Sequence, residues 1–301
     1  GGPFLSGIDN IPPEKLRLMF MGMGGPFSAI PLKHLLQSDT NICAVVTPGC
    51  ASSGQLPLLQ EGPPATIVDL ALARAIPVET VDNLKDASTL ARLAAYRPHV
   101  ILVACFPYIF PPALLQLPPL GCVNLHPSLL PAYRGPSPLF WQFRQGERQT
   151  GVTLHLMNER PDAGHILLQR AIPLDDGASG PATEALLAEQ GGQLMLEALR
   201  LMGQNRLTPQ PQDEAAGSYH PWPAAQDFQI PTRWSAQRAF NFIRGTQDWG
   251  HVYEIIVNQA RFAIQSARSY SKDHSLDRPY VSLGPELWVQ FSPGVLRARK
   301  L

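Results

Sequence analysis

The sequence lacks three features that would place the protein in a specialised class: a membrane-spanning run, a cysteine framework and an excess of charge. No apolar stretch reaches the roughly 20 residues that a membrane helix needs. The four cysteines show neither a CxxC pair nor the spacing of a zinc site, which favours buried thiols in a reducing compartment. Lys plus Arg and Asp plus Glu each number 24, which argues against a strongly basic nucleic-acid binder but leaves room for a local basic patch.

The first residues also lack the pattern of a secretory leader. Residues 1–15 contain no basic segment followed by an apolar stretch, so we predict an N-terminal extension rather than a signal peptide. Together with the absence of a disulfide framework, this predicts a cytoplasmic protein without a membrane association. No pattern indicates an obligate protein partner.

The order of the predicted elements indicates an α/β fold. A strand over residues 16–21, a glycine-rich turn, a helix over 27–36 and a strand over 42–47 follow the strand–helix–strand order of parallel sheets. Residues 48–64 are rich in Gly, Pro and Ser and are predicted as a loop. The alternation then continues to a long helix, which predicts one doubly wound, mainly parallel sheet over residues 16–205.

The rest of the chain is predicted as a second, smaller domain. Residues 206–223 are rich in Pro and Gln and are predicted as a linker. Residues 224–301 begin with a helix and continue with short β-like runs, which favours a small β-rich domain of OB-like type.

The most informative stretch is the apolar strand predicted at residues 122–126. Asn124 and His126 alternate with apolar residues, so both side chains point to the same face of the strand. Pro127 follows directly and ends regular strand pairing. The amide and the imidazole therefore lie at a strand end, where open α/β sheets bind their ligands.

A carboxylate completes the candidate catalytic group. Asp162 lies in the loop after the alternating strand predicted at residues 151–157. If that strand neighbours the Asn124 strand in a parallel sheet, their carboxyl ends meet at one edge and the three side chains converge. No Ser or Cys is placed among them as a nucleophile, which favours direct transfer between two bound molecules over a covalent intermediate.

These three residue types suit the attack of an amine on an activated carbonyl. Asn124 and His126 can donate to the oxygen that becomes negative, at about 3 kcal/mol for each good donor. Asp162 can take the proton from the amine, directly or through water. Each residue alone also has a structural explanation, such as an Asx turn at Asp162. Among the other histidines, His155 is expected to have a structural role, and His165, just after Asp162, is a weaker candidate for a residue at the edge of the site.

Two other kinds of site receive little support. Gly22, Gly24 and Gly25 follow a strand and precede a helix, but position 27 is Phe, so the spacing of a dinucleotide-binding GxGxxG motif is not met. A tight turn is the better interpretation. The sequence contains no metal-binding motif.

Two sequence blocks closely resemble the folate-dependent formyltransferase family. The first is the run NLHPSLLP at residues 124–131, followed by YRG at 133–135. The second combines TGVT at 150–153 with DAGHILLQ at 162–169. The similarity begins at residues 18–22 and extends into the C-terminal part, at the length of the methionyl-tRNA formyltransferase branch.

The resemblance implies a Rossmann-like catalytic domain and 10-formyltetrahydrofolate as formyl donor, without a metal. The family's catalytic Asn, His and Asp match Asn124, His126 and Asp162. Its folate pocket is formed by a strand end with its loop and by the loop before the catalytic Asp. These correspond here to Ala104, Cys105, Phe106, Pro107 and Tyr108, and to Met157, Asn158, Glu159, Arg160 and Pro161.

The acceptor amine stays open between a small molecule and methionyl-tRNA. The tRNA branch typically carries a basic loop after its second strand, whereas here no Lys or Arg occurs between Lys33 and Arg74. Phosphate binding depends on such cations, so this departure favours a small amine such as an amino sugar or an amino acid derivative. Hydrolysis of the same donor and a non-catalytic folate-binding role are the alternatives.

Overall fold

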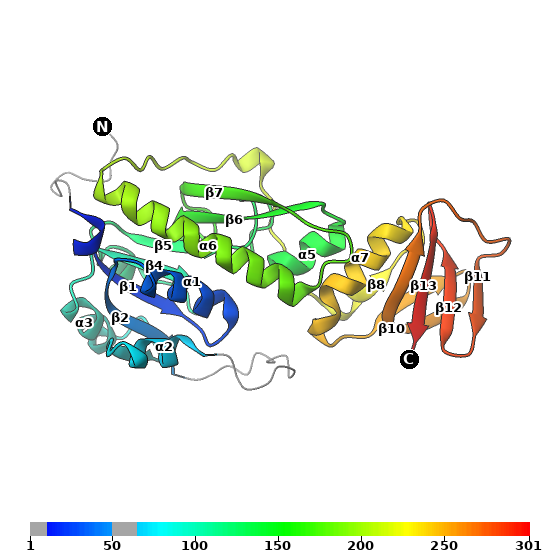
Figure 1. Cartoon of the computed structure of the whole chain (residues 1–301), viewed down its shortest axis with the longest axis horizontal. Helices are drawn as coiled ribbons and strands as arrows, with labels where there is room; N and C mark the ends of the chain where they lie inside the picture. Colours follow the sequence, from blue (N-terminus) through cyan, green and yellow to red (C-terminus); the bar gives the residue numbers. More distant parts are fainter. Residues whose placement is uncertain (1–10, 50–64) are drawn as a thin grey trace. The chain divides into compact units, whose positions relative to one another are not determined.

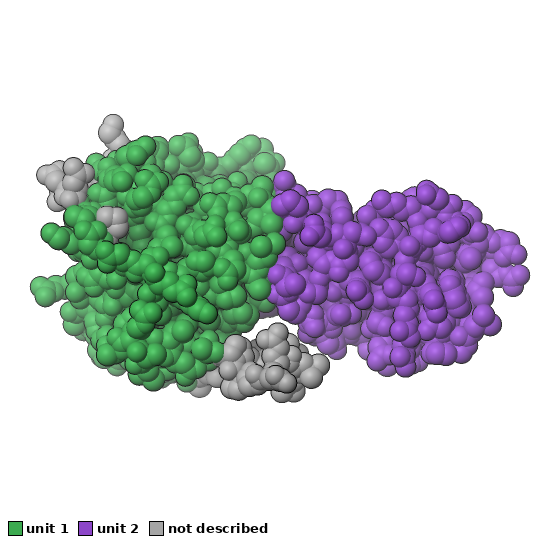
Figure 2. Space-filling model, in the orientation of Figure 1, with its two compact units in different colours: residues 1–134, 151–172, 184–219 green, residues 135–150, 173–183, 220–301 purple. Residues whose placement is uncertain are grey.

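The computed structural model describes residues 11–49 and 65–301 (Figure 1). Contacts within the chain define two compact units, coloured separately in Figure 2. Unit 1 comprises residues 1–134, 151–172 and 184–219, and unit 2 comprises residues 135–150, 173–183 and 220–301. The predicted loop at residues 48–64 and the predicted extension at residues 1–15 lie largely outside the described residues.

A seven-stranded sheet with the order β3-β2-β1-β4-β5-β6-β7 forms the centre of unit 1. Strands β1 to β5 are parallel where they pair, and β6 runs antiparallel to β5. The predicted α/β fold with a mainly parallel sheet is therefore confirmed. The strands are β1 Arg17–Gly22, β2 Asn41–Pro48, β3 Val78–Val81, β4 Val100–Ala104, β5 Cys122–His126, β6 Gln149–Leu156 and β7 Ile166–Pro173.

Helices cover both faces of this sheet (Figure 1), and capping residues stabilise the starts of two of them. Thr66 and Asp69 form a capping box at the start of α2, and Asp86 accepts a hydrogen bond from Ser88 N at the start of α3. The helices are α1 Pro26–Leu36, α2 Ile67–Ala73, α3 Ala87–Ala95, the short α4 Pro112–Leu115 and α6 Gly180–Gly203. None of the helices among the described residues could cross a bilayer.

Different elements pack on the two faces of the unit 1 sheet, and the alternation along β5 determines which face its polar side chains share. Helix α6 approaches one face closely because a Cβ on Gly191 would lie only 2.3 Å from the Leu125 side chain. Ile101, Val103 and Cys122 belong to an apolar cluster on the other face, which also contains Leu93 of α3. Since Cys122, Asn124 and His126 alternate with Leu125, they share this second face.

Unit 2 is built around a six-stranded sheet with the order β11-β12-β13-β10-β9-β8. All of its pairs are antiparallel except the β8–β9 pair. This confirms the predicted β-rich C-terminal part. The strands are β8 Gln229–Ile230, β9 Tyr253–Val257, β10 Ala260–Ser271, β11 Tyr280–Leu283, β12 Glu286–Gln290 and β13 Val295–Lys300.

Two helices of unit 2 pack through an aromatic core. Helix α7, Ala236–Thr246, contacts α5, Pro138–Gln145, and Gly245 permits this approach because a Cβ there would lie 2.3 Å from the Phe143 ring. Phe140 of α5 has its ring centroid 5.6 Å from that of Phe242 of α7 and 5.1 Å from that of Phe228.

Short 3-10 helices occur in both units, at Pro13–Lys15, Glu214–Ala216, Ala225–Phe228 and Gln247–Trp249.

Candidate active site

Asn124 and His126 lie on β5, the strand at which the parallel part of the sheet ends. The two side chains point to the same face, as their spacing predicts. His126 is almost completely buried, with 5% of its surface exposed, whereas Asn124 is half-buried. Strand β5 thus places an amide and an imidazole next to each other at the edge of the apolar cluster.

Asp162 reaches this pair by a different route from the one that the sequence predicts. The expected parallel neighbour is wrong, because β6 is antiparallel to β5 and places His155 opposite Asn124. The end of β6 therefore lies beside the start of β5, with Met157 N donating to Cys122 O at 2.8 Å. The loop of residues 157–165 folds back over this face, and Asp162 Oδ1 lies 3.5 Å from His126 Nδ1. Asp162 therefore lies close to His126, although the C-terminal ends of β5 and β6 lie at opposite edges of the sheet.

The hydrogen bonds of His126 define the roles of its two ring nitrogens. Nε2 lies 2.8 Å from the carbonyl oxygen of Tyr133. Since a carbonyl oxygen only accepts, Nε2 carries a hydrogen, and Nδ1 is the atom that faces Asp162. Both ring nitrogens of His126 therefore lie beside an acceptor, and these two contacts fix the orientation of the imidazole.

His155 contacts the candidate catalytic residues, which the sequence analysis did not predict. Its Nδ1 lies 3.0 Å from Leu156 O and its Nε2 lies 3.3 Å from Asn124 Nδ2. Nδ1 must donate to the carbonyl, so Nε2 accepts from the Asn124 amide and fixes its orientation. His155 Nε2 also lies 4.0 Å from Asp162 Oδ1. The pairing of Asn124 with His155 across β5 and β6 would have indicated this contact, but the sequence alone does not show which residues pair between two strands.

Burial keeps His155 neutral. Desolvation lowers its pKa to about 4, and the nearby His126 acts in the same direction. The folded protein therefore resists protonation of a group that the unfolded chain protonates near pH 6.5. The resulting stability penalty is absent above pH 6.5, grows as the pH falls and levels off near pH 4.

We expect His155→Gln to reduce the loss of stability in acid. Gln is neutral at every pH and can still accept from Asn124, so it removes the protonation penalty of about 2 to 3 kcal/mol expected near pH 4.5. Urea unfolding at pH 7 and pH 4.5 measures this difference for both proteins. An equal loss of stability in the native protein and the variant would show that His155 is not the responsible group.

The Asp162 loop depends on a glycine. Asp162 itself has a positive φ of 58°, which an Asp tolerates better than most residues. Two residues later, a Cβ on Gly164 would lie 1.5 Å from Leu156 O, so no larger residue fits unless the loop moves away from β6. The close packing of Gly164 therefore determines where the Asp162 carboxylate lies.

Gly164→Ala is expected to displace Asp162 and to lower both activity and stability. We expect a loss of activity of about 100-fold, because a shift of about 1 Å at a reacting group has this effect. Turnover and the thermal unfolding midpoint are the measurements. Gly24→Ala is the matched control, since a Cβ at that position meets nothing within 4 Å. Equal behaviour of the two variants would contradict the role of Gly164.

The two loops predicted to bind folate contribute side chains to one apolar cluster. Phe106 and Tyr108, after β4, and Met157, after β6, all pack against it. The rings of Phe106 and Tyr108 meet edge to face at 5.6 Å. Cys105 is exposed and has a positive φ of 60°, unlike buried Cys43 and Cys122. Ala104 is buried, whereas Pro107 and the polar residues Asn158, Glu159 and Arg160, with Pro161 and His165, are exposed.

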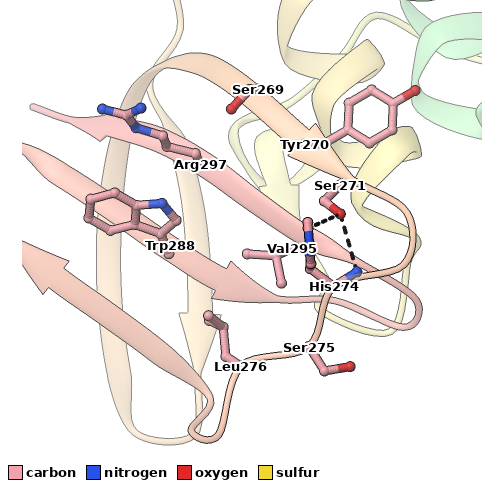
Figure 3. Close-up of a pocket in the computed structure, with 9 residues that line it drawn as sticks. All are labelled: Ser269, Tyr270, Ser271, His274, Ser275, Leu276, Trp288, Val295 and Arg297. Atoms are coloured by element: carbon pink, nitrogen blue, oxygen red, sulfur yellow. Dashed lines mark hydrogen bonds between the residues drawn. The ribbon is translucent and has the colours of Figure 1, made fainter.

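A cavity lies in unit 2, on the face of the sheet drawn in Figure 3. Its volume is about 400 Å³, and Trp288, Arg297, Ser271 and His274 are among its nine lining residues. His274 Nδ1 pairs with Ser271 Oγ at 2.7 Å, and the Arg297 guanidinium lies 5.2 Å from the Trp288 ring centroid. The lining residues include no carboxylate, so this cavity does not repeat the group on β5. Within residues 11–49 and 65–301, no three His, Cys, Asp or Glu side chains gather as metal ligands.

Comparisons with known proteins define the class. A family model described as formyl transferase matches residues 16–199. The chain therefore belongs to the formyl transferase family and is a transferase enzyme. The match includes Asn124 and His126 on β5 and Asp162 in the loop after β6.

Curated relatives carry a more specific name. Methionyl-tRNA formyltransferase of Synechococcus sp. (strain JA-3-3Ab) is 39% identical over 235 residues, covering 76% of this chain and 71% of that protein. The methionyl-tRNA formyltransferase of Halalkalibacterium halodurans is 33% identical over 240 residues, covering 80% of this chain and 74% of that protein.

Solved structures share the fold across both units. WlaRD, a sugar 3N-formyl transferase solved with dTDP and 5-N-formyl-THF, has a TM-score of 0.69 and 15% identity, covering 95% of this chain and 98% of that one. The N-formyltransferase from Helicobacter canadensis, solved with folinic acid and dTDP-3-aminofucose, has a TM-score of 0.70 and 14% identity, covering 95% and 100%. At these identities the likeness concerns the fold alone.

Proposed function

We propose that this protein transfers the formyl group of 10-formyltetrahydrofolate to the nitrogen of a primary amine. The observation that carries the proposal is the approach of His126 Nδ1 to Asp162 Oδ1 at 3.5 Å, on the face of β5 that also bears Asn124. The family match and the folate ligands of the related structures support the donor. Phe106, Tyr108 and Met157 offer an apolar wall beside the site for the pterin ring.

In this reaction Asp162 acts as the base. The amine nitrogen forms a bond to the formyl carbon, and the carbonyl electron pair moves onto the oxygen. Asp162 takes a proton from the attacking nitrogen, directly or through water, and returns it to N10 of the folate as the bond from carbon to N10 breaks. Protons and electrons balance without a covalent enzyme intermediate or a metal ion.

Asn124 and His126 stabilise the negative oxygen. The Asn124 amide has two N–H donors; one meets His155, and we assign the other to the oxygen. We also assign His126, which is held by Asp162 and by Tyr133 O, to the electrostatic stabilisation of this oxygen. Each such donor or charge in a site without bulk water contributes about 3 kcal/mol to the transition state.

Two acceptors compete, and each has an observation in its favour. The names of the curated relatives favour methionyl-tRNA. The absence of Lys and Arg between Lys33 and Arg74 favours a small amine, since phosphate contacts depend on cations. The amino sugar named with the related Helicobacter canadensis enzyme is one such small amine.

A competition experiment distinguishes the two acceptors. The protein is incubated with 10-formyltetrahydrofolate, methionyl-tRNA and an excess of a dTDP-linked amino sugar, and the formylated products are separated by mass. Formyl-methionyl-tRNA as the main product, decreasing steeply with salt, would establish the tRNA acceptor. Methionyl-tRNA with an acetylated amino group is the control. No formylated product from any amine would overturn the transferase proposal.

A further inference from the structure

A segment of unit 1 far from β5 in the sequence borders the candidate active site. Residues 212–218, which we call the strap, follow the antiparallel bridge between Gln210 and Ile166 at the start of β7. The Pro- and Gln-rich composition of residues 206–223 predicts that this region is part of a linker. In the structure its side chains and backbone form hydrogen bonds to two loops of the site.

The first contact of the strap is with the Asp162 loop. Gln212 Nε2 donates to Asp162 O and to Gly164 O, at 2.8 Å in both cases. Gln212 Oε1 accepts from Nε and Nη2 of Arg134 at 3.1 and 2.8 Å. Carbonyl oxygens only accept and a guanidinium only donates, so only one orientation of the Gln212 amide satisfies both sides.

Arg134 anchors the strap beside the Asp162 loop. It is buried, with 8% of its surface exposed, and its guanidinium also forms two hydrogen bonds to the Glu214 carboxylate, at 2.9 and 3.0 Å. Two-pronged bonds of this kind restrict the geometry of both partners. Gln212 and Glu214 of the strap therefore both hold the Arg134 guanidinium. The guanidinium in turn orients the Gln212 amide, whose Nε2 donates to the Asp162 loop.

The second contact of the strap supports the partner of His126. Tyr133 N donates to Ser218 Oγ at 2.9 Å, and Arg134 N donates to Ser218 O at 2.9 Å. Tyr133, with a positive φ of 60°, carries the carbonyl that accepts from His126 Nε2. One segment thus holds the backbone on both sides of the His126–Asp162 pair.

We propose that the strap positions the two loops of the active site and that Gln212 is the positioning residue for Asp162. The inference rests on the proposed function, in which Asp162 is the base. Gln212 touches neither carboxylate oxygen, so it acts through the backbone on either side of Asp162, which its two hydrogen bonds hold against β6. Without them the carboxylate loses its alignment with His126 and with the amine.

Gln212→Glu tests this role with little change in shape. The carboxylate keeps an acceptor for Arg134 but has no donor, and it faces two carbonyl oxygens. We expect kcat to fall by about 10- to 100-fold, because misplacement of a reacting group by about 1 Å has an effect of this order. Gln210→Glu is the matched control, since it introduces the same charge on an exposed side chain two residues away, and it should stay within about twofold of the native kcat.

A double-mutant cycle with Asp162→Asn separates positioning from general damage. If Gln212 acts through Asp162, adding Gln212→Glu to Asp162→Asn lowers kcat by less than about threefold further, since coupled residues are not additive. The same 10- to 100-fold loss in both backgrounds would overturn the proposal, as would a native-like kcat for Gln212→Glu.

Amide hydrogen exchange of the peptide covering residues 158–166 provides a readout that does not depend on turnover. We expect faster exchange in Gln212→Glu than in Gln210→Glu. Unchanged exchange would also overturn the proposal. If the native protein formylated no amine but exchange still increased, the proposed function would fall and the positioning of the loop would stand.

Discussion

Replacement of Asp162 by Asn is expected to lower kcat by about 1,000-fold, within the range found for removal of a general base. Asn keeps the size of the side chain but cannot take the proton of the attacking amine. The half-buried carboxylate lies 3.5 Å from His126 Nδ1, so this variant also removes the negative charge beside the imidazole. Initial rates of formyl transfer at saturating donor and acceptor measure the effect.

The control for this variant is Asp86→Asn. Asp86 caps α3 through Ser88 N, and Asn caps helices equally well, so we expect activity within about twofold of native. Thermal unfolding should be similar for both variants. A rate for Asp162→Asn within tenfold of the native rate would assign the proton transfer to another group.

Replacement of His126 by Asn is expected to lower kcat by about 1,000- to 10,000-fold. In the proposed reaction His126 stabilises the negative oxygen and also pairs with Asp162, so its removal takes away two contributions to the stabilisation of the transition state. The affinity for a stable folate analogue, measured separately, should change by less than about threefold, because the apolar wall of the pterin site lies on other loops.

His274→Asn is the matched control, since it removes an exposed imidazole of unit 2 and should leave kcat unchanged. The double variant of His126 and Asp162 should be little worse than the poorer single variant, because the two residues act as a unit. Consumption of the donor at the uncatalysed rate by both the native protein and His126→Asn would favour the alternative of a non-catalytic folate-binding protein.

Much of the sheet could be predicted because several of its strands are short apolar runs, and β1, β2 and β5 end at or just before a Gly or Pro. Strand β5 agrees with its prediction at both ends, since the apolar alternation begins at Cys122 and Pro127 follows His126. The bounds of helix α5 could not be predicted, because its buried residues are consecutive and do not recur with a helical period. Only short β-like runs were expected in this part of the chain, whereas β10 has 12 residues, and pairing with β13 holds its polar second half.

The candidate site could be predicted only in part, because the sequence shows which residues share one strand but not which distant segments come together. Asn124 and His126 share a face because they lie two apart on one strand, and this spacing is local. The approach of Asp162 was expected from a parallel neighbour, whereas an antiparallel β6 and a loop that folds back bring it to His126. The contacts of His155 and Gln212 depend on cross-strand register and on hydrogen bonds between distant segments, and neither leaves a pattern in the sequence.

The fate of the formyl carbon is the most direct test of the proposed transfer. The native protein is mixed with 10-formyltetrahydrofolate labelled with ¹³C in the formyl group, with and without an amine acceptor, and mass spectrometry follows the label. We predict that the label appears as an N-formyl group on the acceptor and that formate forms much more slowly without an acceptor. Release of labelled formate at the same rate in both reactions, with no labelled acceptor, would contradict the account and identify a hydrolase.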